Sequence, residues 1–167
     1  RETDDGERSS VQFPHPFFND LRVRQAFAYA IDRAAIADLY GPTGQATTNV
    51  LVSPPPFESP NTQNLYPFDL TKAARLLDEA GWTDTDGDRI RDNGKIRKPG
   101  EPLITMRVLL QTAASPIRQQ TQEIIKRTLN SIQADVQLTF FDSITFFSSD
   151  PTVINTRHHF CADLDMF

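Results

Sequence analysis

The stretch LITMRVLLQTAASPIRQQTQEIIKRTLNSIQADVQLTFF, residues 103–141, predicts the fold most directly. Apolar residues alternate over 104–110 and again over 136–140, which is typical of β-strands. Between them, Ser115-Pro116 opens a segment whose apolar residues recur at helical spacing. A strand–helix–strand unit predicts two parallel strands joined by a right-handed crossover. We therefore expect an α/β fold whose mixed sheet is built on this unit and flanked by helices.

Three helices are expected before this unit. The first follows Asn19 or Asp20 as its N-cap, and its apolar residues share one face. Asp32 begins or continues a second helix that ends near Gly41, and Asp69 caps a third that ends at Gly81. The intervening stretch 42–67 is expected to lie ordered over the domain surface.

A turn-rich segment, TDTDGDRIRDNGK, follows the third helix. Asp86-Gly87 and Asn93-Gly94 are turn signals that flank a short strand-like run, which predicts a hairpin. Asp84, Asp86 and Asp88 resemble the start of a calcium loop, but the loop's sixth and twelfth positions hold Arg89 and Lys95. We interpret this run as a solvated hairpin tip, with a weak ion site as the alternative.

Bulk properties narrow the class of protein. The 167 residues suit one domain, which we place at 13–167 after a flexible lead-in at 1–12. The net charge of −5 argues against nucleic-acid binding. No apolar run reaches the roughly 20 residues of a membrane helix. The last residues alternate as a strand from Phe160 to Phe167, so we expect a fragment of a larger protein.

Sequence motifs give little support for catalysis. Phosphate-loop, nucleophile-elbow and zinc-protease motifs are all missing. His159, Cys161 and Asp163 would share one strand face, but an ordinary strand is a better interpretation than a metal site. Cys161 is interpreted as a buried structural cysteine. Arg157 precedes the last strand, where its guanidinium suits a peptide carboxylate through a bidentate bond, although a surface arginine is the alternative.

Two motifs stand in sequence order, RVRQAFAYAIDR (22–33) and YPFDLTKAARLLDEAGW (66–82). Together they resemble motifs of the family 5 extracellular solute-binding proteins, which include oligopeptide-, dipeptide- and nickel-binding proteins. The segment DTDGDRIRDNGK and the strand–helix–strand unit ending TFFDSITFF follow in the order expected for that family. The resemblance covers roughly residues 17–167.

The resemblance implies one lobe of a type II periplasmic-binding-protein-like fold, the distal lobe of a two-lobed protein. Members capture a solute in the cleft between lobes and deliver it to an ABC permease. They stand outside the cytoplasmic membrane as periplasmic proteins or lipoproteins. The expected partners are therefore a peptide or other small solute, the missing second lobe and the permease, with no cofactor, no metal and no enzymatic activity.

The resemblance also indicates which residues contact solute. In peptide-binding relatives this lobe contributes the loop after the strand that precedes the long helix, which here contains Gln111, Thr112 and Ala113 with Ala114. It also contributes basic residues near the last strand, where Arg157 sits. The relatives' loop arginine is missing here, because Gln111 or Thr112 takes its place, and this leaves the solute class open.

Two other hypotheses remain open at this stage. One is an enzyme with a thiol or metal centre near Cys161. The other is a stand-alone interaction module that uses a phenylalanine-rich surface. Truncation alone would also leave such a surface partly exposed and drive self-association. The phenylalanines concerned are Phe17, Phe18, Phe140, Phe141, Phe146 and Phe147.

Overall fold

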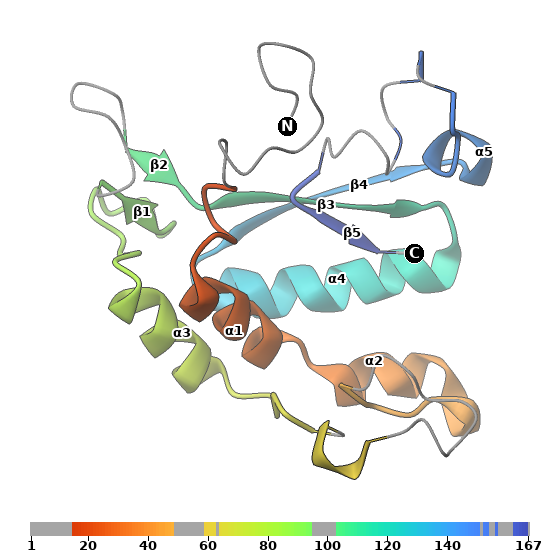
Figure 1. The fold of residues 1–167 in the computed structure, drawn as a ribbon, viewed down its shortest axis with the longest axis horizontal. Helices are drawn as coiled ribbons and strands as arrows, with labels where there is room; N and C mark the ends of the chain where they lie inside the picture. Colours follow the sequence, from red (N-terminus) through yellow and green to blue (C-terminus); the bar gives the residue numbers. More distant parts are fainter. Residues whose placement is uncertain are drawn as a thin grey trace.

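The computed structural model describes residues 15–48, 59–62, 64–94, 103–150, 152–153, 156 and 162–166. Four helices lie on one side of a small parallel sheet (Figure 1). The elements are, in chain order, α1 (Leu21–Ala30), α2 (Arg33–Leu39), the 3-10 turns Gly41–Thr43 and Pro60–Thr62, α3 (Leu70–Glu79), β1 (Asp92–Asn93), β2 (Ile104–Thr105), β3 (Arg107–Ala113), α4 (Pro116–Ser131), β4 (Asp135–Phe141), α5 (Ser143–Phe146) and β5 (Leu164–Met166). The lead-in at 1–12 lies outside the described residues.

The predicted strand–helix–strand unit is confirmed. β3 and β4 pair in parallel along their whole lengths, from Arg107 opposite Asp135 to Ala113 opposite Phe141. α4 connects them, and β5 pairs in parallel with the other edge of β3, so the strand order is β4-β3-β5. The predicted last strand is described only as Leu164–Met166. All three strands of this sheet therefore point the same way.

The core lies between this sheet and the helices. Val108, Leu110 and Val136 project from one sheet face and are almost fully buried in a cluster with Ile125 and Leu129 of α4. Their apolar burial is the main favourable contribution to folding. Among the described helices, none has the length and apolar character needed to cross a lipid bilayer.

Aspartates begin the first three helices as the sequence predicts. Asp20 accepts from the backbone N–H of Arg22, Asp32 from Ala35 and Asp69 from Lys72. These bonds satisfy backbone donors that the first helical turn leaves free.

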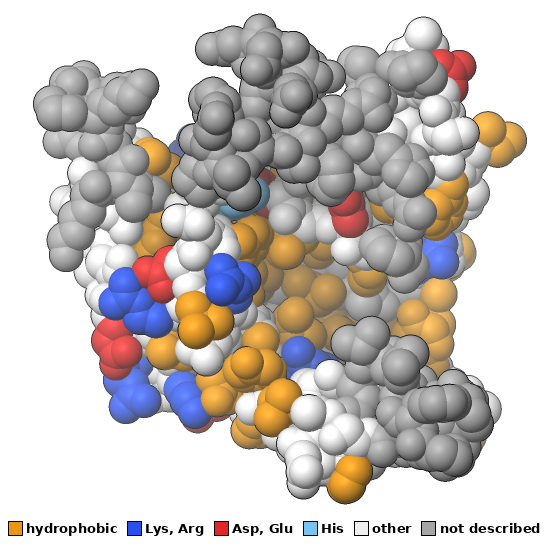
Figure 2. Space-filling model, viewed as in Figure 1, with side chains coloured by type: hydrophobic (Ala, Val, Ile, Leu, Met, Phe, Trp, Pro, Cys, Tyr) orange, Lys and Arg blue, Asp and Glu red, His pale blue; other side chains and the backbone are white. Residues whose placement is uncertain are grey.

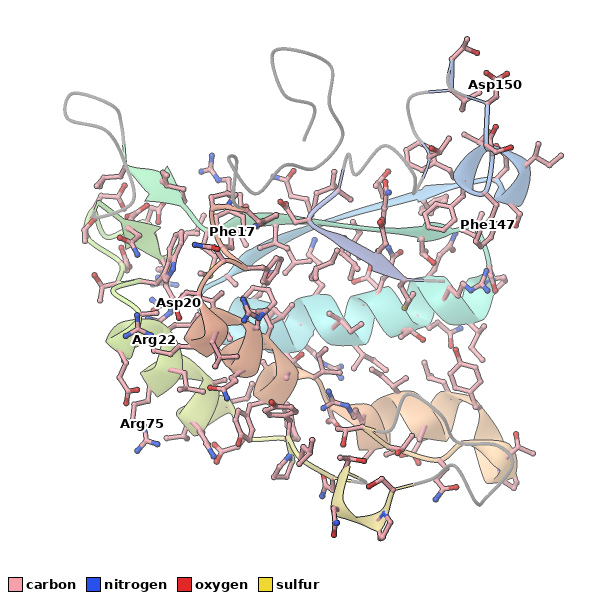
Figure 3. All side chains as sticks on the ribbon, viewed as in Figure 1. Phe17, Asp20, Arg22, Arg75, Phe147 and Asp150 are labelled. Carbon is pink, nitrogen blue, oxygen red and sulfur yellow. The ribbon has the colours of Figure 1, made fainter. Side chains whose placement is uncertain are left out.

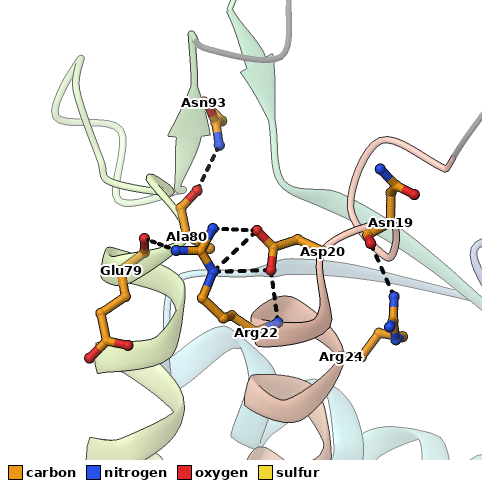
Figure 4. A network of polar contacts seen from close by, with 7 residues as sticks. All are labelled: Asn19, Asp20, Arg22, Arg24, Glu79, Ala80 and Asn93. Atoms are coloured by element: carbon orange, nitrogen blue, oxygen red, sulfur yellow. Dashed lines mark hydrogen bonds and ion pairs between the residues drawn. The ribbon is translucent and has the colours of Figure 1, made fainter.

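One of these caps also joins two helices (Figure 4). The Arg22 guanidinium bonds the Asp20 carboxylate and donates to the carbonyl of Glu79 at 2.6 Å, so it ties the start of α1 to the end of α3. Its hydrogen bonds hold the pKa of Asp20 below the ordinary value for aspartate.

The antiparallel pairing expected of a hairpin is present after α3, but the single strand expected from Leu103 is not. Thr83 forms an antiparallel bridge with Asp92 across the turn that contains Asp86-Gly87, and β1 then pairs antiparallel with β2. The strand expected from Leu103 is divided at Met106. Met106 donates to the Arg91 carbonyl and accepts from Asp135, so the chain changes pairing partner at this residue.

The acidic turn between Thr83 and Asp92 bonds its own backbone. The carboxylates of Asp84, Asp86 and Asp88 come within 4.8 Å of one another. They accept from backbone N–H groups of the same turn, those of Gly87, Asp88, Arg89 and Ile90. This arrangement fits the interpretation of the segment as a solvated tip.

Arg91 is a buried charge that joins three parts of the structure. Its side chain is 6% exposed and pairs with Asp78 of α3. Its guanidinium also donates to the carbonyls of Trp82 and Ile132 at 2.6 and 2.8 Å. The carbonyl of Ile132 follows the end of α4, so Arg91 links α3, the turn after it and α4.

We predict that Arg91→Met lowers the free energy of unfolding by about 2–4 kcal/mol, because buried acceptors lose their charged donor. The matched control is Arg75→Met, because the Arg75 side chain is 67% exposed. This control should stay within about 0.5 kcal/mol of the unsubstituted chain. Urea unfolding followed by circular dichroism measures both, and equal effects would contradict the assignment.

Candidate ligand-binding site

The carboxyl ends of β3, β4 and β5 meet at one edge of the sheet, beside the start of α4 and α5 (Figure 1). In open α/β sheets, ligands bind in the crevice outside the carboxyl ends of the strands. We call this part of the lobe the carboxyl edge. It is formed by the last residues of the three strands together with the turn Ala114–Ser115 and α5.

The predicted binding segment lies at this edge, but its assignment to a loop is wrong. Gln111, Thr112 and Ala113 are the last three residues of β3, and each is buried. The strand continues through them because Thr139–Phe141 of β4 pairs with all three. Only Ala114 and Ser115 remain as a connection, and Ala114 still donates to the Phe141 carbonyl at 2.7 Å.

Two buried polar side chains hold the strands together at this edge. The Thr112 hydroxyl donates to the Met166 carbonyl of β5 at 2.6 Å. Gln122 of α4 donates its amide to the carbonyls of Leu110 in β3 and Thr139 in β4, at 3.0 and 3.1 Å. Sequence reasoning missed Gln122, because a glutamine on a helix is ordinarily exposed and no spacing marks it as buried.

Gln111 is different from Gln122 although both are 1% exposed. The Gln111 side chain lies on the opposite strand face from Leu110, in one row with its register partners Thr139 and Asp165. Its Nε2 is buried and has no hydrogen-bond partner among the described residues. A buried amide without a partner costs free energy, so its presence at a candidate site is informative.

The start of α4 leaves capping groups available to a ligand. Ser115 occupies the predicted N-cap position with Pro116 as the first helical residue, but the Ser115 side chain makes no capping hydrogen bond to α4. The first N–H groups of a helix carry partial positive charge and favour anions or carbonyl oxygens. The helix therefore begins at Ser115-Pro116 as the sequence predicts, without a side-chain cap.

Apolar side chains line the other part of the edge. Phe140, Ile144 and Phe147 are 54%, 87% and 41% exposed, and we call these three residues the apolar rim. Figure 3 places Phe147 beside α5, at this end of the sheet. Asp142 caps α5, and hydrogen bonds from Thr145 hold the pKa of Asp142 below its usual value.

Not every phenylalanine expected to be exposed is so. Phe17 and Phe146 are 5% and 0% exposed. Phe17 packs edge-on against Trp82, and Phe146 belongs to α5, which contacts β3. Figure 2 shows hydrophobic side chains gathered in a hollow between the sheet and the helices α1 and α2. Apolar surface is thus present, but it is made by fewer aromatic residues than predicted.

Asp163 pairs with a residue from the start of the chain. Its carboxylate accepts from His15 Nε2 at 2.9 Å and from the backbone N–H of Leu109 at 2.8 Å. His15 Nδ1 accepts from the N–H groups of Phe17 and Phe18, so Nε2 carries the ring proton. Asp163 therefore anchors the segment before α1 to the sheet, which sequence spacing alone did not reveal.

Several predicted residues lie outside the described part of the chain. These are Arg157, His158, His159 and Cys161. Thr156, directly before Arg157, is fully buried.

The fold is one lobe of the periplasmic-binding-protein type, and comparison with known proteins gives the family. Residues 5–157 match the bacterial extracellular solute-binding proteins, family 5 Middle. The chain belongs to this family. The predicted family and fold class are confirmed.

Individual relatives share parts of this chain. A Brucella ovis protein that carries the name of an ABC transporter peptide-binding protein is 41% identical over 75 residues, which is 44% of this chain and 14% of that protein. The nickel-binding periplasmic protein of Escherichia coli is 33% identical over 122 residues, 72% of this chain and 22% of that protein. The chain thus spans less than a quarter of these relatives.

A solved structure has the same fold. The oligopeptide-binding protein of Thermus thermophilus, complexed with a pentapeptide, is 27% identical with a TM-score of 0.65. The match covers 75% of this chain and 20% of that protein.

The two buried glutamines allow a matched test. Gln111→Met removes an unpartnered buried amide at nearly constant shape, so we predict that it raises the free energy of unfolding by about 1 kcal/mol. Gln122→Met leaves two strand carbonyls without their donor and should lower it by about 1–2 kcal/mol. Denaturant unfolding measures both, and destabilisation of similar size by both variants would contradict the assignment of Gln111.

Proposed function

We propose that this chain is a solute-contacting lobe of the substrate-binding component of an ABC importer. It captures peptides or similar small solutes in a cleft between two lobes and delivers them to the permease. The observation that carries this proposal is the carboxyl edge of the parallel sheet, in a chain that belongs to a family of extracellular solute-binding proteins.

The edge offers the two kinds of surface that a peptide needs. The start of α4 and the turn Ala114–Ser115 supply backbone polar groups for the peptide's main chain. The apolar rim supplies contacts for a side chain. Sites of this kind combine an apolar lining with a few fixed polar groups.

The predicted site residues have different roles in this proposal. Gln111 and Thr112 are buried, so they shape the edge from beneath, and the Gln111 amide supplies a hydrogen bond when a solute or the second lobe covers it. Ala113 is the last residue of β3 and directly precedes the turn Ala114–Ser115. Arg157 binds a carboxylate of the solute through its two-pronged guanidinium.

Closure of a second lobe supplies the remaining contacts with the solute. A second lobe closes on the solute by a hinge motion, and the solute shifts the equilibrium because it contacts both lobes. The protein works outside the cytoplasmic membrane, held there by a lipid anchor in its full-length form, and it binds its solute without transforming it.

Identification of the solute is the first experiment. The full-length protein is purified under native conditions, and mass spectrometry of the released small molecules should find peptides. Preparations that consistently release one non-peptide solute instead would contradict the peptide part of the proposal.

We predict that Arg157→Ala in the full-length protein weakens solute binding about tenfold or more, because a charged bidentate bond is lost. Arg75→Ala is the control, since Arg75 is exposed on α3 and pairs with Glu79 one helical turn away. Isothermal calorimetry with the identified solute measures both. Unchanged affinity in Arg157→Ala would remove Arg157 from the site.

A further inference from the structure

Two hollows lie on either side of Arg33, away from the sheet. One has a volume of about 410 Å³ and is lined by α2 and residues 43–47. The other has a volume of about 370 Å³ and is lined by residues 31–34 together with Tyr66, Pro67 and Phe68. Both volumes fall within the range of small-molecule sites. Arg33, Ala46 and Thr47 border both hollows.

Only part of the Arg33 guanidinium has a structural task. Its Nη1 donates to the carbonyls of Ala28 and Tyr66, at 2.9 and 3.2 Å, and so fixes the end of α1 against the segment before α3. Its Nε and Nη2 make no hydrogen bond to any described residue. The Arg33 guanidinium is therefore held in place through Nη1, while Nε and Nη2 are available to a ligand.

The partly buried charge of Arg33 has no ion-pair partner among the described residues. Burial lowers the pKa of Arg33, and no carboxylate among the described residues offsets this effect. A partly desolvated cation is stabilised when an anion reaches it. The two hollows that Arg33 lines give an anion access to this side chain.

A carboxylate lines the same hollow without pairing with Arg33. Asp32 borders the hollow of about 370 Å³, and its Oδ1 accepts from the backbone N–H of Ala35. Among the described residues, no partner bonds its Oδ2. One hollow thus presents an available guanidinium and an available carboxylate oxygen on adjacent residues.

Two aromatic residues line the same hollow. Tyr66 packs edge-on against Tyr29, with ring centroids 5.2 Å apart, which holds the Tyr66 ring in place. Phe68 is 44% exposed, so part of its side chain is accessible to a ligand. Aromatic side chains prefer such stacked or edge-on partners.

We propose that this hollow binds a free aromatic α-amino acid: Arg33 binds the α-carboxylate, Asp32 binds the α-ammonium group, and Tyr66 and Phe68 contact the aromatic side chain. This second site is separate from the carboxyl edge. α2 contacts α4 on the side away from the sheet, so α4 lies between the two sites (Figure 1). The proposal does not depend on the transport function.

The test is an NMR titration of the isotope-labelled chain with L-phenylalanine, phenylacetate and phenethylamine. The last two ligands each lack one of the charged groups. We expect L-phenylalanine to shift backbone resonances of residues 31–36 and 64–68 and to bind about tenfold more tightly than either analogue, the effect of one charged hydrogen bond.

Asp32→Asn separates the site from the fold. Asparagine keeps the N-cap of α2 but removes the charge, so the spectrum should stay folded while L-phenylalanine binding falls about tenfold to the level of phenylacetate. Asp38→Asn, an exposed position of α2 that does not line the hollow, is the control and should bind as the unsubstituted chain does.

Three results would overturn the proposal. The first is an unchanged spectrum at residues 31–36 and 64–68 with L-phenylalanine at millimolar concentrations. The second is Asp32→Asn binding as tight as that of the unsubstituted chain, and the third is a set of shifts confined to the carboxyl edge. The last result would remove the second site while supporting solute binding at the edge, so the two proposals fail separately.

Discussion

β3 lies between two parallel partners, and the rest of the lobe depends on that pairing. Because β4 runs parallel to β3, the chain must cross over between them, and α4 makes this crossing on the face that the core residues occupy. β5 adds a third strand in the same direction. The parallel arrangement gathers three carboxyl ends at one edge, where open α/β sheets bind their ligands, and this is why we propose the solute site there.

Buried polar groups at the same edge differ in whether they have hydrogen-bond partners. Thr112 and Gln122 have bonded partners and join strands to one another and to α4. Gln111, equally buried, has an amide nitrogen that finds no partner among the described residues. Natural proteins break the rule of satisfied buried groups mainly at functional sites, where a ligand or another domain completes the bonding. The contrast between the two glutamines thus links the packing of the lobe to its proposed use.

Sequence patterns predicted the elements that follow from local chemistry. The alternation over 104–110 and 136–140 and the aspartate caps of α1, α2 and α3 all appear in the structure. Local patterns could not show that the strand divides at Met106, because the division comes from a change of pairing partner. The family resemblance placed Gln111 to Ala113 in a loop, whereas pairing with β4 keeps them in the strand. The contact between His15 and Asp163 spans most of the chain and has no local signal.

The central claim is that this lobe binds a solute tightly only together with a second lobe. Calorimetry of one peptide with this chain alone and with the full-length protein tests the claim most directly. The account predicts clear binding by the full-length protein and affinity at least about a hundredfold weaker for the chain alone, since half of the contacts and the closure are lost. Equal affinity for both would contradict it.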